Sequence, residues 1–319
     1  MVSEYIGMIG TNASLRVHRQ TLRELYALII KDLGPVISDN KVIHLDIPLH
    51  LNIGDLLIDW GTEFFIRDCN ASCISRYSVR DLDRFMSRDT EKSTILLLHG
   101  GGNFGDIYPI HQKLRLKVVK AYPNNAIIIL PQTVHYTDES ILVRDAAVFN
   151  NHRHLKVCLR DQKSFDLLAQ YISSEKLLLL PDMAVALTDE LDSGHSKSGK
   201  TLFFRRRDIE KCRVDGTQTG FDWMDLVTKK DERHLRLSRR CLRGKKGWLK
   251  NHYGHRLQKQ LRDSLIKRAV AHFQQYGVID SDRLHGIILA QLLQIQTVVR
   301  DNSYGKNSDY CDAWFNQEQ

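Results

Sequence analysis

The stretch TILLLHGGGNFGD, residues 94–106, decides the fold, because four apolar side chains run directly into a histidine and a glycine-rich turn. Similar apolar segments recur along the chain, separated by stretches long enough for a helix: VIHLDI (42–47), AIIILP (126–131), LKVCLR (155–160) and KLLLLP (176–181). Strands that are apolar at nearly every position are typical of parallel sheets covered by helices on both faces. We therefore predict an α/β fold.

The remaining pattern predicts a second α/β unit. Apolar residues recur at helical spacing over 14–33, with Ser14 as the N-cap and Gly34-Pro35 as the end of that helix. Four further helices, at 56–66, 109–121, 138–150 and 162–172, and a short strand at 71–77 precede the polar linker 188–199. Beyond the linker we predict strands over 201–207, 276–282 and 297–301 and helices over 255–276 and 283–293. These elements predict two domains, residues 1–190 and 200–319.

Composition excludes several classes of protein. The 319 residues are 42% hydrophobic and 26% charged, an ordinary globular balance, and no apolar run approaches the roughly 20 residues of a membrane-spanning helix. Six cysteines occur without CxxC spacing, which disfavours a zinc site or a disulfide scaffold. The first residues do not match a secretory signal, so we expect a cytoplasmic protein. The net charge of +8 is concentrated in residues 229–268, where fifteen Lys and Arg face three acidic residues.

The polar residues of interest follow the predicted strands, where doubly wound sheets bind their ligands. Gly100, Gly101 and Gly102 either form a tight turn or let backbone N–H groups approach an anion. HGGG also resembles an esterase oxyanion loop, but the chain has no G-x-S-x-G nucleophile motif, which argues against acyl hydrolysis. GHSKSGKT (194–201) matches a P-loop, yet it precedes a predicted strand rather than a helix, so we interpret it as part of the linker.

Cationic side chains also follow strands. Arg283 offers a planar fork for carboxylate or phosphate, and His285 can transfer a proton near neutral pH; the alternative is a surface Arg–Asp pair beside a buried histidine. Arg160, with Ser164 one turn into the next helix, either binds substrate or forms an exposed ion pair. Arg205, Arg206 and Arg207 end another strand, with Arg206 on the face opposite to its two neighbours.

The motifs taken together resemble the polysaccharide pyruvyl transferase family. The matching pieces, in chain order, are NIGD (52–55), HGGGNFGDIYP (99–109), ILPQT (129–133), LRDQKS (159–164), LLPD (179–182), FFRRRDIE (203–210), SDRLHG (281–286) and NSYGK (302–306), followed by Trp314. The resemblance implies a glycosyltransferase-B-like architecture, in which two Rossmann-like domains face a cleft. It also implies transfer of the carboxyethylidene group of phosphoenolpyruvate onto two hydroxyls of one sugar, with release of phosphate and without a metal or organic cofactor. The acceptor would be an exopolysaccharide or its lipid-linked precursor.

Site residues follow from placement and from this resemblance. His285 is the principal acid–base candidate, and Asp55 is the candidate for binding or deprotonating the acceptor, with a helix N-cap as its alternative role. The expected substrate-binding set comprises Arg283, Arg160, Ser164, Gly100, Gly101, Gly102, Asn103, Asp106, Asn52, Arg207 and Lys306.

Other readings stay open. Fold alone does not identify the donor, so a nucleotide-sugar-dependent glycosyltransferase is the competing enzyme, and a non-catalytic membrane-docked scaffold is the competing non-enzyme. The basic segment 229–268 suits the anionic inner face of a membrane or an acidic glycan, or is simply a solvated helix face. No nucleic-acid recognition motif accompanies it, so we expect no nucleic-acid partner.

Overall fold

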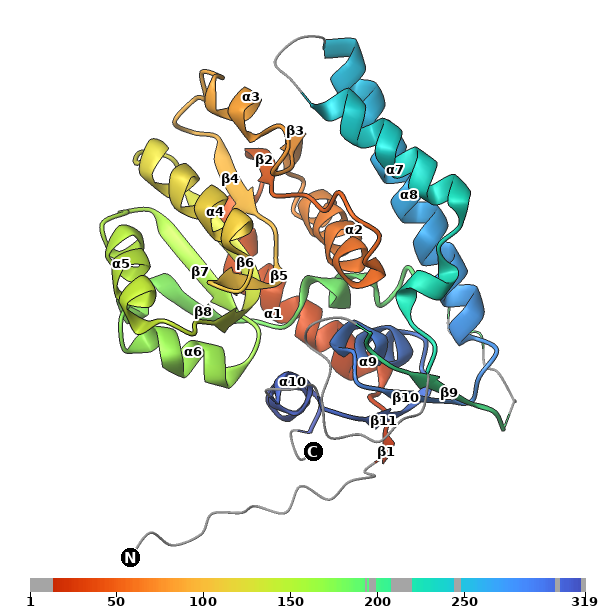
Figure 1. Cartoon of the computed structure of the whole chain (residues 1–319). Helices are drawn as coiled ribbons and strands as arrows, with labels where there is room; N and C mark the ends of the chain where they lie inside the picture. The colour runs from red at the N-terminus through yellow and green to blue at the C-terminus, as the bar shows by residue number, and fades with distance from the viewer. Residues whose placement is uncertain are drawn as a thin grey trace, which may run out of the picture.

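The computed structural model describes residues 14–192, 194, 199–207, 220–243, 248–301 and 305–316. It is an α/β structure with two sheets, both of them mainly parallel (Figure 1). The Rossmann-like character predicted from the apolar strands is confirmed. The glycosyltransferase-B arrangement and the division near residue 190 stay predictions.

The larger sheet has the strand order β3-β2-β4-β6-β7-β8, with β5 paired to β6 beyond the end of β4. Its strands are β2 (Lys41–Leu45), β3 (Ser72–Tyr77), β4 (Ile95–Leu98), β5 (Gly101–Gly105), β6 (Ile127–His135), β7 (Leu155–Leu159) and β8 (Leu177–Leu179). The intervening helices are α2 (Ile53–Asp68), α3 (Leu82–Met86), α4 (Pro109–Ala121), α5 (Glu139–Asn150) and α6 (Gln162–Ala169). All its strand pairs are parallel, as expected for strands buried on both faces.

The smaller sheet has the order β1-β11-β10-β9. Its strands are β1 (Ser14–Leu15), β9 (Thr201–Phe204), β10 (Val278–Ser281) and β11 (Gln296–Val299). The elements around it are α1 (Arg19–Ile37), α7 (Lys229–Leu242), α8 (Trp248–Phe273), α9 (Leu284–Leu292), α10 (Lys306–Trp314) and the 3-10 helices η1 (Ser174–Lys176), η2 (Met183–Leu187) and η3 (Trp223–Leu226). Among the described helices, none combines the length and apolar character needed to cross a membrane.

Two hydrophobic cores hold the sheets in place. One face of the larger sheet packs against α3, α4, α5 and α6 through residues such as Phe85, Leu114, Phe149 and Leu168. The other face shares a continuous core with α1, α2, η2 and the smaller sheet. The polar ends of both sheets are therefore held in a fixed relation by buried apolar side chains.

Three local predictions were wrong. Residues 14–15 form a strand that pairs antiparallel with β11, and α1 begins only at Arg19, so Ser14 is not its N-cap. The same helix continues past Pro35 to Ile37: proline removes one backbone hydrogen bond, and the helix closes with the Ser38 N–H donating to the Gly34 carbonyl. The segment Gly101–Gly105 is a strand beside β6 rather than a turn into a helix. The structure confirms that Thr201 begins a strand rather than a helix, which argues against a P-loop; residues 195–198 of that match lie outside the described residues.

Candidate active site

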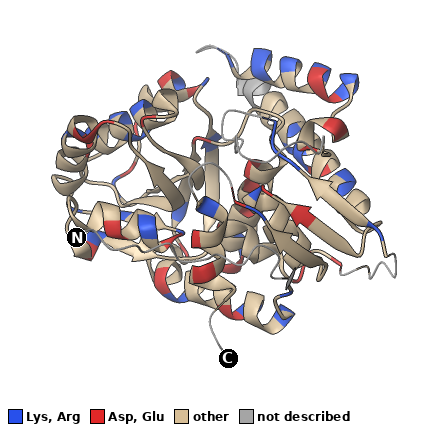
Figure 2. Cartoon of the chain, turned by 60° about the horizontal axis from the view of Figure 1, so that its bottom comes forward, with Lys and Arg blue, Asp and Glu red and all other residues tan. Residues whose placement is uncertain are grey.

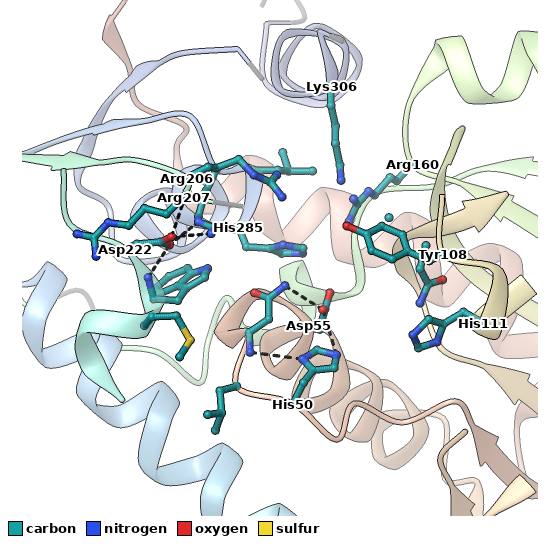
Figure 3. A pocket seen from close by; sticks show the side chains of 18 residues that line it. His50, Asp55, Tyr108, His111, Arg160, Arg206, Arg207, Asp222, His285 and Lys306 are labelled. Carbon is teal, nitrogen blue, oxygen red and sulfur yellow. Dashed lines mark hydrogen bonds and ion pairs between the residues drawn. The ribbon is translucent and has the colours of Figure 1, made fainter. Parts of the chain in front are cut away.

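A pocket of about 520 Å³ lies where the two sheets approach each other, and residues of both halves line it (Figure 3). Its walls come from the start of α2, from β5 and α4, from the end of β7, and from the residues around β9, η3, α9 and α10. Of the predicted residues, the pocket is lined by Asn52, Asp55, Gly102, Asn103, Arg160, Arg207, Arg283, His285 and Lys306. The two halves of the predicted site therefore do meet.

The first turn of α2 presents a carboxylate to the pocket. Asn52 caps the helix, since its Oδ1 accepts from the backbone N–H of Gly54 at 3.1 Å, and its Nδ2 donates to Asp55 Oδ2 at 3.0 Å. His50 Nδ1 accepts from the Asn52 backbone N–H at 3.4 Å, which leaves its ring proton on Nε2, 3.4 Å from Asp55 Oδ2. Burial raises the pKa of Asp55, but the larger combined effect of neighbours such as His50 and His285 lowers it. The Asp55 carboxylate is therefore ionised. Asn52, not Asp55, is the N-cap.

A second carboxylate, Asp182, joins the two strongest predicted residues. Its Oδ2 accepts from Arg160 Nη1 at 2.5 Å and lies 3.4 Å from His285 Nε2. Burial opposes ionisation of Asp182, yet His285 and Arg160 hold its pKa well below the usual range. The start of α2 packs against the other side of the imidazole, because a Cβ atom on Gly54 would lie 2.5 Å from His285 Nδ1. The ring is fixed from both sides.

The opposite corner of the pocket is cationic. The Arg160 side chain is fully buried; its Nε donates to Thr133 Oγ1 at 2.9 Å, and its Nη2 has no hydrogen-bond partner among the described residues. A Cβ atom on Gly102 would lie 3.3 Å from that Nη2 and would collide with Lys306 Nζ. Figure 3 shows Lys306 reaching this corner from α10 above and Arg160 reaching it from the side. A bare backbone, an ammonium and an unpartnered guanidinium N–H thus converge at one point.

The arginines of the smaller sheet are held by acidic residues. Arg283 contacts Asp222 through Nε at 2.6 Å and through Nη2 at 2.8 Å, so its fork is occupied by a carboxylate although it lines the pocket. Arg207 donates to both oxygens of Asp225 at 2.8 Å, and this pairing keeps its guanidinium at the margin. Arg206 is 8% exposed and lines the pocket.

Another histidine lies on the α4 side. His111 Nδ1 is 2.8 Å and 2.9 Å from the two oxygens of Asp46, whose backbone adopts a left-handed φ of 62°. Burial lowers the pKa of His111, but the hydrogen bond and charge of Asp46 outweigh it and raise the pKa. Beside it, Asn103 Oδ1 accepts from Arg115 Nη2 at 2.8 Å.

Four predicted residues do not line the pocket. Asp106 Oδ2 accepts from the backbone N–H and hydroxyl of Thr137, which ties β5 to the segment after β6. Ser164 Oγ accepts from the Val134 N–H at 2.8 Å and joins α6 to β6. Gly100 packs on the carbonyl of Pro131. Gly101 contacts the Asp55 side chain, since an added Cβ atom would lie 3.5 Å from Asp55 Oδ1. Sequence position placed these residues at strand ends but could not give the direction of their side chains.

Several lining residues were missed by sequence reasoning: His50, Tyr108, His111, Arg206, Asp222, Trp223 and Met224. Asp182, which contacts the lining residues Arg160 and His285, was also missed. Asp182 had a signal, since it ends the LLPD motif that follows β8. The predicted strand 201–207 set Arg206 apart from Arg207 by alternation, but β9 ends at Phe204 and both side chains line the pocket. His111 and Asp222 had none, as their partners are remote in sequence.

One buried group outside the pocket could offer metal ligands: His44, Asp59 and His99. Both oxygens of Asp59 are already bonded, one to Arg76 and the other to Arg262 Nη1 at 2.9 Å. Two guanidinium charges beside the carboxylate disfavour a further cation there. We therefore assign Asp59 to an internal ion-pair network.

Comparisons with known proteins agree on one family. The family model described as polysaccharide pyruvyl transferase matches residues 52–304. The chain is 32% identical over 286 residues to EpsO of Bacillus subtilis, a protein provisionally named a pyruvyl transferase, with 87% of this chain and 86% of the relative covered. It is 25% identical over 292 residues to pyruvyl transferase 1 of Schizosaccharomyces pombe, covering 86% and 69%. A crystal structure of an uncharacterized Klebsiella pneumoniae protein has a similar fold, with a TM-score of 0.53, 20% identity, and 92% and 94% of the chains covered.

Proposed function

The chain belongs to the polysaccharide pyruvyl transferase family, and we propose that it transfers the carboxyethylidene group of phosphoenolpyruvate onto two hydroxyls of one sugar, forming a pyruvate ketal. Family membership supports a transferase acting in polysaccharide synthesis. We propose an exopolysaccharide or its lipid-linked precursor as the acceptor, and two Rossmann-like domains of the glycosyltransferase-B type as the frame.

The donor suits the cationic corner. Phosphoenolpyruvate carries a phosphate and a carboxylate, and buried anions need charge-assisted hydrogen bonds to offset desolvation. Arg160 Nη2 is buried without a partner among the described residues, beside Gly102 and Lys306. This unpartnered guanidinium N–H is the observation that carries the proposal, because an anion would satisfy it.

The proposed chemistry needs an acid and a base. The methylene carbon of the donor takes a proton, which gives its central carbon cationic character; a sugar hydroxyl attacks that carbon and loses its proton. The bond from the central carbon to the phosphate oxygen then breaks, phosphate leaves with the electron pair, and the second hydroxyl closes the ketal and loses its proton. His285 is suited to the first proton transfer, because its imidazole lines the pocket and is held in place by Asp182, 3.4 Å from its Nε2.

The acceptor suits the α2 side. Asp55 is ionised and can accept a hydrogen bond from a sugar hydroxyl, while His50 Nε2 and Asn52 Nδ2 orient it. Because this carboxylate and His285 both line the pocket, protonation of the donor and deprotonation of the first hydroxyl each have their own group. The proposed scheme calls for no metal or organic cofactor, since the donor itself carries the leaving group.

The test is phosphate release from phosphoenolpyruvate across a panel of acceptor glycans, with the product examined by NMR for a new ketal carbon. We expect phosphate release that depends on both donor and acceptor and is insensitive to chelators. Nucleotide sugars serve as the competing donors in parallel reactions. Glycosyl transfer from a nucleotide sugar without phosphate release from phosphoenolpyruvate would overturn the proposal.

A further inference from the structure

The basic segment 229–268 folds into a helical hairpin of α7 and α8 at the edge of the molecule (Figure 1). Four of its basic residues are used internally. Arg262 and Lys259 pair with acidic residues of α2, Arg268 pairs with Asp231, and Arg239 donates to the carbonyl of Leu49. The rest of its described positive charge is available for another purpose, and Figure 2 shows repeated bands of Lys and Arg along the hairpin, at the upper right.

The remaining charge on α7 is ordered. Its buried face, spaced by four and three residues, consists of Asp231, Leu235, Ser238 and Leu242. Its exposed face carries, at the same spacing, what we call the α7 stripe: Lys229, Arg233, Arg236 and Arg240. These side chains form no ion pair or hydrogen bond with any described residue. Leu237, which is 40% exposed, lies next to the stripe on α7. Glu232 is the one exposed acidic residue of this helix.

The hairpin adjoins the pocket. Met224 of η3 lines the pocket, is 53% exposed, and is followed within five residues by the start of α7. Arg239 Nη2 donates to the Leu49 carbonyl at 2.6 Å, next to His50 and Leu51 of the pocket wall. A surface bound along α7 would therefore lie beside the pocket.

We propose that the α7 stripe binds the surface of an anionic phospholipid bilayer. The stripe extends over about 17 Å at the helical rise per residue, which matches an extended charged surface better than a single small anion. Cations close to an anionic leaflet each strengthen binding, and an exposed apolar side chain among them can enter the headgroup region. The reason to bind there, access to a lipid-linked acceptor, rests on the proposed function, but the binding itself does not.

The test is co-sedimentation of the full chain with vesicles of phosphatidylcholine alone or mixed with phosphatidylglycerol, with no donor or acceptor present. We expect binding only to the anionic vesicles, and weaker binding as salt rises. The variant R233Q/R236Q/R240Q should bind them about 100-fold more weakly, since each lost charge contributes about 1 kcal/mol.

The matched control is K113Q/K117Q/K120Q, because these three exposed lysines have helical spacing on α4 and their loss changes the net charge equally. Its binding should be unchanged, and both variants should keep the wild-type melting temperature. Equal weakening in both variants would overturn the proposal, as would no preference for anionic vesicles. So would retention on an acidic polysaccharide or duplex DNA with no binding to vesicles. Because the assay contains no substrate, failure here leaves the proposed transfer reaction to its own test.

Discussion

At the scale of single residues, the pocket is organised by carboxylates that hold cationic side chains. Asp182 holds Arg160 and His285, Asp222 holds Arg283, and these pairs fix the direction of each side chain. Groups fixed in this way lose little freedom when a substrate binds, which is what preorganised electrostatic catalysis requires. The residues thus differ in use: one Arg160 N–H has no partner among the described residues, whereas the Arg283 guanidinium contacts both oxygens of Asp222.

The variant H285Q tests the role of the imidazole. Glutamine keeps a polar group in the position but cannot transfer a proton, so we expect phosphate release to fall by about 10²–10⁴-fold. Binding of phosphoenolpyruvate, followed by the ligand-induced rise in melting temperature, should change little. The control H154Q removes an exposed histidine outside the pocket and should leave both readings intact. Unimpaired ketal formation by H285Q would eliminate this role.

The pair of His111 and Asp46 gives a pH-dependent prediction. The folded-state pKa of His111 is raised, so its stabilisation is complete below the unfolded value of about 6.5 and is lost as pH rises through the folded value. The loss of free energy of unfolding in H111Q should therefore be larger near pH 5.5 than near pH 9. Urea denaturation of both proteins across this range checks it. A difference that grows with pH would contradict the assigned ion pair.

At the scale of elements, the periodic segments were predictable and the glycine segment was not. Strands such as Ile95–Leu98 and helices such as Pro109–Ala121 follow from local apolar spacing alone. Gly101–Gly105 has no such pattern, and its extended conformation depends on pairing with β6, which is remote in sequence. For the same reason, α7 was not predicted as a separate helix. Most of its residues are charged, and its narrow apolar face is buried only by packing against α8.

The strand β5 predicts a strong effect at Gly105. Its φ is 118°, and a Cβ atom there would overlap the carbonyl oxygen of His135. G105A should therefore lower the free energy of unfolding by about 3 kcal/mol or more, through backbone strain and steric overlap. G199A is the matched control, because no atom of the described residues lies within 4 Å of its added Cβ; its effect should stay within about 0.5 kcal/mol. Urea unfolding of both variants provides the measurement, and equal losses would contradict the close approach of β5 to β6.

At the scale of the whole molecule, one hydrophobic core runs from the larger sheet through α1 and α2 to the smaller sheet. The sequence indicates that charged residues follow the strands of each half, but not that these strand ends face each other. That relation depends on which apolar faces pack together, and therefore on contacts between residues more than a hundred positions apart. Asp55 and His285 meet through such contacts.

A buried ion network attaches the basic hairpin to this body. Asp59 of α2 is fully buried between Arg76 and Arg262, and these two guanidiniums hold its pKa well below the usual range against the effect of burial. D59N removes the fully buried carboxylate between the two arginines and leaves them only Glu63 as a shared partner, so we expect a loss of about 3 kcal/mol in the free energy of unfolding. E91Q breaks the exposed pair with Lys41, 3.0 Å long, and should cost less than about 1 kcal/mol. Similar losses in the two variants would mean that burial does not decide the strength of these pairs.

Donor binding should need both halves of the molecule at once, because Arg160 follows a strand of the larger sheet and Lys306 begins α10 beside the smaller one. In excess ligand, each tenfold loss of affinity lowers the ligand-induced stabilisation by about 1.4 kcal/mol, which the melting temperature reports. R160K keeps the positive charge but lacks the planar guanidinium that donates to Thr133 and Asp182 and still presents an N–H to a ligand. K306Q removes the second cation of this corner. Both variants should lose most of the rise in melting temperature caused by phosphoenolpyruvate, whereas K267Q, which changes an exposed lysine of α8, should keep it. If only R160K lost the response, Lys306 would not contribute to donor binding. The donor would then bind to the larger-sheet side of the pocket alone, and the smaller-sheet side would be left to bind the acceptor.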